Sequence, residues 1–293
     1  DFLRTLEIIY GRYKEYAKDS PYIIELQKRS LQCLMNEIYS ASDQIKCSIV
    51  IPVFNQVEYT RQCLEAIIEH TPDDLYEVII VDNGSTDKSI EIAQKEGAKV
   101  IFEPEKGYGS AYLKGFSEAK GDIIVMGDAD NTYDFSQIPR FILPIKEGYD
   151  FVIGSRFKGK IKKGAMPWAN RYIGNPLLTF LLNLFFKSQL SDVYSGMRAL
   201  KRETYNRMNL ISRGMEFALE MLVSSLRLKS RIKEVSISYF PRKGKSKLSP
   251  VMDTWRSIRF MLLFSPDYLF LIPGLVLFVL GIVFVFLFLR EGV

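Results

Sequence analysis

Short apolar runs alternate with amphipathic stretches through the middle of the chain. Residues 47–54 (CSIVIPVF) and 77–82 (EVIIVD) are continuous apolar runs rich in β-branched side chains, and a helical spacing of apolar positions over 59–69 separates them. Runs of this length and composition predict strands that are buried on both faces. The order strand, helix, strand predicts a βαβ unit.

The same alternation continues along the chain. Further helices are predicted over 88–96, 109–119 and 175–186, and further strands over 99–102, 122–126, 151–154 and 232–239. Repeated alternation of this kind predicts an α/β fold with a mostly parallel, Rossmann-like sheet and helices on both faces. Ligands are then expected at the carboxyl ends of the strands. The run 175–186 is unusually apolar and fits core packing and membrane contact equally well.

The two ends of the chain follow other patterns. Residues 1–41 have helical spacing, with Ser20 and Pro21 as N-cap and first helical position of a second helix, and they predict a helical hairpin. It could be a dimerisation arm, the remnant of a longer helical domain or a brace on the next domain. Residues 268–289 form 22 residues without a charge. As a helix they would span about 33 Å, enough to cross a membrane, and a fully buried core helix is the alternative.

The segment before this span has the pattern of a helix lying at a membrane surface. Its apolar positions are interleaved with basic ones, and Trp255 and Tyr268 are suited to the headgroup level. Basic residues precede the span, which places the large N-terminal part in the cytoplasm. Four units are therefore expected: a helical extension (1–45), an α/β domain (46–248), interfacial helices (249–267) and a transmembrane helix (268–289). Because the chain begins with Asp rather than Met, we expect it to be a fragment.

Composition excludes several classes of protein. A chain of 293 residues that is 47% hydrophobic and 25% charged forms a real core, which excludes intrinsic disorder and disulfide-stapled miniproteins. Its three cysteines, Cys33, Cys47 and Cys63, form no Cys-x-x-Cys pair, so neither a structural zinc site nor a disulfide framework is indicated. The only histidine, His70, excludes His-rich metal sites and fits a solvated helix end.

The positive charge is local. Residues 156–171 hold six basic side chains and no acid, and residues 242–259 hold six against one acid, whereas the whole chain has a net charge of only +5. Two such patches predict an anionic partner nearby, with a solvated surface as the alternative. No recognised nucleic-acid motif accompanies them, so nucleic acid is not the expected partner.

Polar side chains follow the predicted strands. Asn55 follows the first strand and Asp82 ends the second, where the segment DNGSTD begins. Asp82 could accept hydrogen bonds from a base or a ribose. Alternatively, Ser85 or Thr86 caps the next helix.

A pair of acids follows the strand that ends at Met126. Asp128 and Asp130 stand two residues apart, and carboxylate oxygens of this kind bind Mg²⁺ or Mn²⁺ while the metal bridges a diphosphate. Two acids in a loop are also often merely solvated.

Taken together, the motifs resemble those of a known family. Their order along the chain is SIVIPVFN, VDNGSTD, KGYGSAYLKG, GDADNTYD, GSR, SGMRAL and RKGKSKL. This set resembles the family 2 inverting glycosyltransferases of the GT-A fold, and within them the polyprenyl-phosphate sugar synthases (dolichol-phosphate mannose or glucose synthase-like). The resemblance covers about residues 47–267 and the following membrane helix. Gln56 departs from the Glu that the family usually has there, a difference that bears on nucleotide choice.

The resemblance implies roles for individual residues. It assigns nucleotide-sugar binding to Pro52, Asn55, Asp82, Gly107, Gly109, Asp128 and Arg156. Donor or acceptor phosphate binding falls to Arg156, Arg198, Arg242, Ser246 and Lys247. The resemblance assigns the binding of a divalent metal, Mg²⁺ or Mn²⁺, to Asp128 and Asp130, and it assigns catalysis to Asp130 and Asp192. Asp192 matches the proposed base, although an orienting role or a helix cap fits it equally, since a phosphate nucleophile is already ionised.

The implied activity is transfer of a hexose from a UDP- or GDP-sugar to a polyprenyl phosphate with inversion. The stretch GDADNTYDF is more similar to the glucose-type branch, so UDP-glucose is the favoured donor. The enzyme would be an integral membrane protein with a cytoplasmic catalytic domain, in contact with membrane lipid. Any homo-oligomer would form through the N-terminal or membrane helices. A transferase for a polysaccharide or another glycolipid, and a non-catalytic membrane scaffold, are the alternatives.

Overall fold

The computed structural model describes residues 47–70, 76–242 and 250–290. The predicted helical extension over 1–45, with its hairpin over 1–41, lies outside these residues, as do Ser246 and Lys247.

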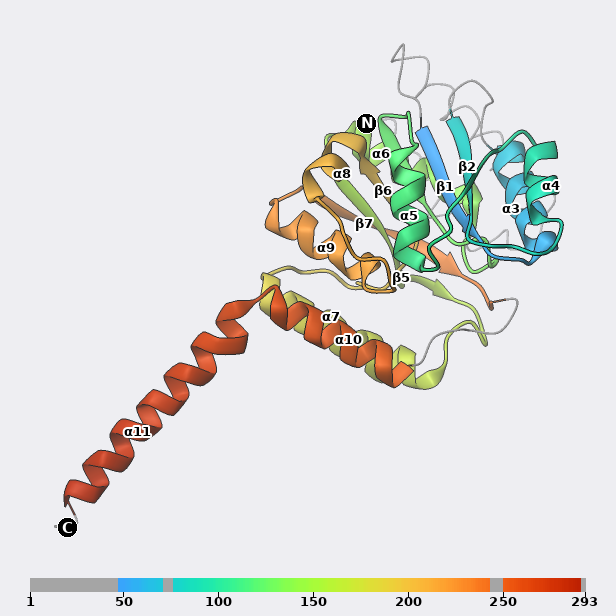
Figure 1. Cartoon of the computed structure of the whole chain (residues 1–293). Coiled ribbons are helices and arrows are strands. Elements are labelled where there is room, and N and C mark those ends of the chain that lie inside the picture. Colours follow the sequence, from blue (N-terminus) through green and yellow to red (C-terminus); the bar gives the residue numbers. More distant parts are fainter. Residues whose placement is uncertain (1–46, 71–75, 243–249, 291–293) are drawn as a thin grey trace, which may run out of the picture.

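A seven-stranded sheet forms the centre of the molecule, in the order β3-β2-β1-β4-β6-β5-β7 (Figure 1). The strands are β1 (Cys47–Val53), β2 (Tyr76–Asp82), β3 (Lys99–Phe102), β4 (Ile123–Met126), β5 (Phe151–Ile161), β6 (Arg198–Lys201) and β7 (Ile232–Tyr239). Neighbouring strands are parallel except at β6, which runs antiparallel to both β4 and β5. This mixed α/β architecture confirms the predicted fold class.

Helices cover both faces of the sheet. They are α3 (Val57–His70), α4 (Ser89–Lys95), α5 (Tyr108–Ser117), α6 (Ile138–Lys146), α7 (Asn175–Phe186), α8 (Arg202–Met208), α9 (Phe217–Arg227), α10 (Pro250–Leu263) and α11 (Ile272–Arg290). Short helical turns lie at η1 (Phe135–Gln137), η2 (Asn170–Gly174) and η3 (Asp267–Leu271). Alternate residues of β1 enter opposite cores: Val50 packs with α5, α7 and α9, whereas Ile49 and Ile51 pack with α3, α4 and α6. Gly115 allows α5 to lie close on this sheet, since a Cβ there would come within 2.2 Å of Val50 Cγ1.

The predicted elements agree best where the apolar pattern is unbroken. The bounds of β3, β7 and α7 are those predicted, and the other predicted strands and helices are present with shifted ends. Strand β6 and helices α6, α8 and α9 were missed. Strand β6 has only two apolar residues between a charged residue at each end, and α6 carries Pro139 and Pro144, so neither segment shows a clean period.

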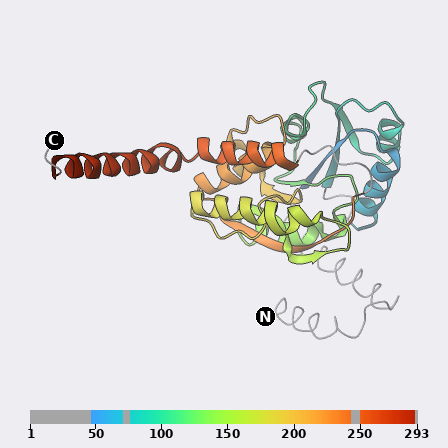
Figure 2. The ribbon, with the colours of Figure 1, turned by 90° about the horizontal axis from the view of Figure 1, so that it is seen from below.

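Helices α7 and α10 lie side by side beneath the sheet domain, as both ribbon views show (Figures 1 and 2). Helix α7 packs in the core on one side, where Leu178 and Leu182 are buried, whereas Leu177 and Phe180 are exposed on it. Membrane contact by this exposed side stays a prediction. Beyond α10, the helical segment Asp267–Arg290 extends away from the domain. It is the one helix among the described residues that is long and apolar enough to cross a membrane, and none of its most apolar stretch is buried.

Candidate functional site

The carboxyl ends of β1, β2 and β4 lie at one edge of the sheet, because these strands are parallel neighbours. Loops leaving this edge carry Asn55, Asp128 and Asp130, whereas Asp82 is the last residue of β2 and the half-buried Pro52 lies within β1. In an α/β sheet this edge is where ligands bind, at the point where successive connections pass to opposite faces. The sheet therefore brings together the polar residues predicted from the strand ends.

The acidic pair lies on the loop after β4. Asp128 Oδ1 accepts a hydrogen bond from Tyr112 Oη at 3.1 Å, and Asp130 Oδ1 accepts from the backbone N and the hydroxyl of Thr132. Burial, and next the charge of Asp130, raise the pKa of Asp128 from 3.8 to about 6. The site therefore holds concentrated negative charge that favours a cation.

A divalent metal fits this pair if the substrate completes its coordination. Among the described residues no group of three or more His, Cys, Asp or Glu side chains gathers as it does in a site built from protein alone. Mg²⁺ is commonly held by one or two carboxylates together with substrate phosphates and water. Asp128 and Asp130 offer the hard oxygen donors that such binding requires.

Two cations reach this region from the other half of the sheet. The Arg156 guanidinium lies 5.1 Å from the centre of the Tyr239 ring, and Arg242 Nη2 lies 2.8 Å from Asp130 Oδ2. Burial raises the pKa of Tyr239, and the charges of Arg156, Asp130, Arg242 and Asp128 all act on that hydroxyl. Tyr239 therefore lies where the predicted acids and cations meet.

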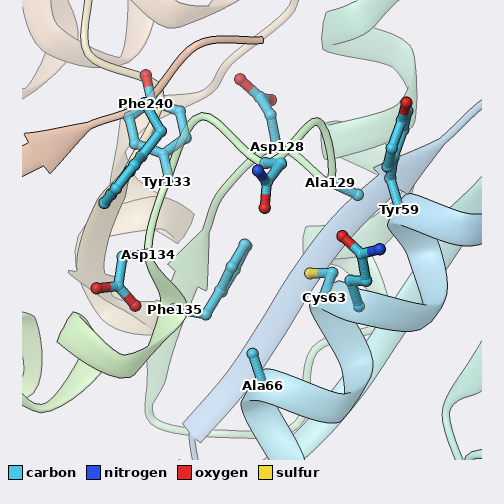
Figure 3. Close-up of a pocket in the computed structure, with 11 residues that line it drawn as sticks. Tyr59, Cys63, Ala66, Asp128, Ala129, Tyr133, Asp134, Phe135 and Phe240 are labelled. Atoms are coloured by element: carbon cyan, nitrogen blue, oxygen red, sulfur yellow. The ribbon is translucent and has the colours of Figure 1, made fainter. Parts of the chain in front are cut away.

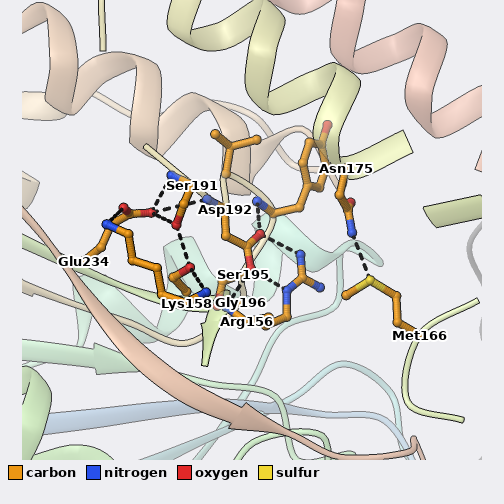
Figure 4. Close-up of polar contacts among 12 residues, drawn as sticks. Arg156, Lys158, Met166, Asn175, Ser191, Asp192, Ser195, Gly196 and Glu234 are labelled. Carbon is orange, nitrogen blue, oxygen red and sulfur yellow. Dashed lines mark hydrogen bonds and ion pairs between the residues drawn. The ribbon is translucent and has the colours of Figure 1, made fainter. Parts of the chain in front are cut away.

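Asp192 is bound to Arg156 by both of its carboxylate oxygens (Figure 4). Oδ2 accepts from Arg156 Nε at 2.7 Å and from the Arg156 backbone N at 2.9 Å, and Oδ1 accepts from Nη2 at 2.8 Å. The side chains are 0% and 7% exposed, respectively. Burial opposes the charge of Arg156, but Asp192 raises its pKa above the ordinary value. Asp192 thus orients the Arg156 guanidinium, and which of its three predicted roles it has in the reaction stays a prediction.

Arg198 occupies a different place from the one expected. Its side chain is fully buried and donates to the backbone carbonyls of Ser195 at 2.9 Å, Val193 at 3.2 Å and Ala218. Burial lowers the pKa of Arg198. The guanidinium thus holds the loop before β6 against α9 and has no surface to offer a phosphate, which does not fit the phosphate-binding role expected for it.

Gly107 and Gly109 lie against another part of the chain. A Cβ at Gly107 would lie 2.3 Å from the carbonyl oxygen of Arg213, and one at Gly109 would lie 2.1 Å from that of Ser212. The Arg213 carbonyl also accepts from the N–H of Ser110 in the first turn of α5 at 3.1 Å. These glycines therefore allow the chain's own 212–213 segment to approach closely, and their contact with the nucleotide stays a prediction.

Asn55 and Asp82 tie the ends of β1 and β2 together. Asn55 Oδ1 accepts from the Thr86 backbone N at 2.7 Å, and Asp82 accepts from the Ser85 backbone N at 2.9 Å. Neither Ser85 nor Thr86 caps α4: the N-cap position is Lys88, whose side chain makes no cap hydrogen bond, and Asp87 accepts from the Ser89 backbone N at 3.0 Å. Asn55 and Asp82, which are both expected to bind the nucleotide, thus set the conformation of the turn at the ends of these strands.

Several site residues were missed in the sequence. Tyr133 Oη accepts from the Gly196 backbone N at 2.6 Å, and a Cβ at Gly196 would lie 2.9 Å from Asp128 Oδ2. The glycine of the SGMR motif is therefore needed for close approach to Asp128. Tyr112 follows Gly109 by three residues and faces the same carboxylate. Helical spacing in the sequence could have placed Tyr112 beside Gly109, but only the fold places Tyr133 beside Gly196.

A cavity of about 250 Å³ lies between α3 and the loop after β4 (Figure 3). Its lining includes Tyr59 and Cys63 from α3, Asp128 and Tyr133 from the loop, and Phe240 after β7. Burial raises the pKa of the Cys63 thiol well above its ordinary value, so it is not a nucleophile. The cavity is smaller than a typical ligand pocket and would hold only part of a nucleotide sugar.

Comparisons with known proteins agree with this architecture. The model of "Glycosyl transferase family 2" matches residues 48–208. The hexosyltransferase Agl6 of low-salt glycan biosynthesis from Haloferax volcanii is 43% identical over 237 residues, 80% of this chain and 57% of Agl6. The dolichyl-phosphate hexose transferase of the same organism is 34% identical over 205 residues, 69% of this chain and 86% of that protein.

Among solved structures, glucosyl-3-phosphoglycerate synthase from Mycobacterium tuberculosis with Mn²⁺ and UDP-glucose has a TM-score of 0.63 at 20% identity. The match covers 79% of this chain and 83% of that one. At this identity the likeness extends to the fold alone.

Proposed function

Because the chain belongs to glycosyl transferase family 2, we propose that it transfers a hexose from a nucleotide sugar to a polyprenyl phosphate with inversion at the anomeric carbon. The observation that carries the proposal is the joining of a cation-rich transferase site to an apolar surface and a helix long enough to cross a membrane. The name of the dolichyl-phosphate hexose transferase supports the same acceptor class.

The apolar surface consists of the exposed faces of α7 and α10 and the segment before α7. Its exposed side chains are Trp168, Tyr172, Ile173, Leu177, Phe180, Leu184, Met252, Trp255 and Leu263. Such a patch, with aromatic residues among it, is suited to the membrane interface. Tyr268 at the foot of the apolar helix donates to the Leu184 carbonyl at 3.0 Å, and its ring lies 4.7 Å from that of Phe185. The helix and the surface would then anchor the domain together at the cytoplasmic leaflet.

In the proposed reaction a phosphate oxygen of the lipid attacks the anomeric carbon, and the bond from that carbon to the nucleoside diphosphate breaks. The electron pair leaves with the diphosphate. Because the attacking oxygen is already ionised at neutral pH, no side chain has to remove its proton. Arg156 and Arg242 offset the repulsion between two anionic substrates, and Asp192 holds Arg156 in place. A metal at Asp128 and Asp130 would supply charge stabilisation for the leaving diphosphate.

The finer assignments belong to the same proposal. UDP-glucose is the first donor to test, and Mg²⁺ and Mn²⁺ are the metals. The transferase domain would cover 46–248, followed by interfacial helices over 249–267 and the transmembrane helix over 268–289. Pro52, Asn55 and Asp82 would shape the nucleotide site.

A product assay tests the proposal. Detergent-solubilised protein is incubated with metal, a polyprenyl phosphate and each of a panel of UDP- and GDP-sugars, and the lipid fraction is read by mass spectrometry. One donor should add one hexose to the lipid. Asp130→Ala should abolish the product, whereas Asp122→Ala, which removes an exposed carboxylate paired with Arg202 at 3.5 Å, should not.

Two results would contradict the proposal. Wild-type turnover in Asp130→Ala would show that the site is elsewhere. Nucleotide binding with metal but no lipid product would move the acceptor to a polysaccharide or another glycolipid.

A further inference from the structure

A buried glutamate outside the predicted site holds the loop that carries Asp192. Glu234 lies on β7, and its side chain is 5% exposed. Its Oε1 accepts from the Ser191 backbone N at 2.7 Å, from Ser191 Oγ at 2.8 Å and from the Asp192 backbone N at 3.2 Å. Its Oε2 accepts from Lys158 Nζ at 2.6 Å. One carboxylate thus binds three donors of the 191–192 segment (Figure 4).

The contacts continue from Glu234 to Arg156 without a gap. Asp192, whose backbone Glu234 holds, binds the guanidinium and the backbone N of Arg156. Ser191 Oγ also lies 2.7 Å from Ser155 Oγ, the residue before Arg156. The segment between α7 and β6 has no regular hydrogen-bonded structure of its own to set the position of Asp192. Glu234 therefore replaces that missing backbone support.

A second buried glutamate has the same kind of contacts in another part of the domain. Glu220 on α9 is 3% exposed. It accepts from the Ile211 backbone N at 3.1 and 3.2 Å and from the Ser212 backbone N at 2.8 Å. The 211–212 segment that it holds packs on Gly109. Glu220 is thus a matched comparison for Glu234, since it holds backbone N–H groups in the same way but in a different loop.

We propose that Glu234 is a positioning residue for the acceptor phosphate, acting through Ser191 and Asp192 to fix the guanidinium of Arg156. The inference rests on the proposed function, in which Arg156 offsets the charge of the two anionic substrates, and it assigns Arg156 to the phosphate of the lipid. A guanidinium fork binds phosphate well only when its plane is fixed, because two parallel hydrogen bonds must form together. Loss of Glu234 should therefore weaken acceptor binding while leaving the carboxylate pair at Asp128 and Asp130 in place.

The test compares four variants in the full chain in detergent: Glu234→Met, Glu234→Gln, Glu220→Met and Lys158→Met. The measurements are KM for polyprenyl phosphate, Kd for UDP with Mn²⁺ and thermal stability. Glu234→Met should raise the acceptor KM about tenfold or more, equivalent to about 1.4 kcal/mol of binding, and leave the Kd for UDP within about twofold. Glu234→Gln keeps an oxygen for Ser191 and Asp192 and should restore most of the affinity. Lys158→Met removes only the partner of Oε2 and should leave the acceptor KM within about twofold.

Glu220→Met separates positioning from a general loss of structure. It buries unpaired N–H groups as Glu234→Met does, so both should lose thermal stability, but only Glu234→Met should raise the acceptor KM. An equal rise in both variants, or no rise in Glu234→Met, would overturn the inference while wild-type transfer still supports the proposed function. If wild-type protein adds no hexose to a polyprenyl phosphate, the proposed function is wrong and the acceptor role of Glu234 is wrong with it.

Discussion

The buried pair of Asp192 and Arg156 gives the sharpest test of the site, because an orienting carboxylate and a catalytic base respond differently to the same change. Asp192→Asn keeps the shape of the side chain and removes its charge. Asp192 is fully buried and Arg156 is 7% exposed, so the guanidinium would lose its counter-charge in a place that water scarcely reaches. Removing one partner of a buried pair typically destabilises a protein by about 3–5 kcal/mol. The carboxylate accepts four hydrogen bonds, two at each oxygen, and an amide oxygen in either place still accepts two of them, so we expect about 3 kcal/mol.

For a domain of this size, 1 kcal/mol lowers Tm by about 2–4 °C, so Asp192→Asn should melt about 6–12 °C earlier. Differential scanning fluorimetry in detergent measures the shift, and steady-state assays measure KM and kcat. The acceptor KM should rise together with the loss of stability. Asp150→Asn is the control: it breaks a partly exposed pair with Lys201, at 2.8 Å, and should lower stability by at most about 1 kcal/mol.

A paired replacement completes the test. Arg156→Met with Asp192→Leu removes both charges and should recover most of the stability without recovering transfer, since an apolar pair of similar volume is often neutral. The reasoning would be refuted if Asp192→Asn kept the wild-type Tm and acceptor KM while kcat fell by about 10²–10⁴-fold. That pattern is typical of a lost general base.

Three further changes test other parts of the molecule. Gly109→Ala should impair folding, because its Cβ would lie 2.1 Å from the Ser212 carbonyl oxygen; a soluble variant with wild-type Tm would show that the 212–213 segment moves freely. Because burial and Asp130 raise the pKa of Asp128 from 3.8 to about 6, the folded state holds this proton more tightly than the unfolded state does. The metal-free protein should therefore lose stability as pH rises from about 4 to about 6. Mn²⁺ should bind more tightly over the same rise, which calorimetry at several pH values would check. Phe180→Asp places a charge on the exposed apolar face of α7, where the side chain is 61% exposed. It should raise the acceptor KM in nanodiscs with little change in Tm, and an unchanged KM would argue against membrane contact there.

Local sequence patterns were sufficient for most of the fold. Strand β3, strand β7 and helix α7 have the predicted bounds because apolar periodicity and flanking polar residues act within a few positions of each other. The pattern failed for β6, where the fully buried Arg198 reads as a surface residue in the sequence. Its side chain is accommodated by three backbone carbonyls, two of them in the preceding loop and one on α9. A buried charge with such partners has no local signature.

The sequence by itself determined the family motifs, the βαβ alternation, the carboxylates at the strand ends and an apolar segment long enough to cross a membrane. These features depend on residue type and short spacing. The tertiary structure alone decided which groups are available: Asp192 engages Arg156 across 36 positions, and Gly109 is covered by a carbonyl from Ser212. It also decided that Glu234 on β7 supports the loop residue Asp192, 42 positions away. Hydrogen bonds over such separations depend on how strands and loops pack, and no local pattern records that packing.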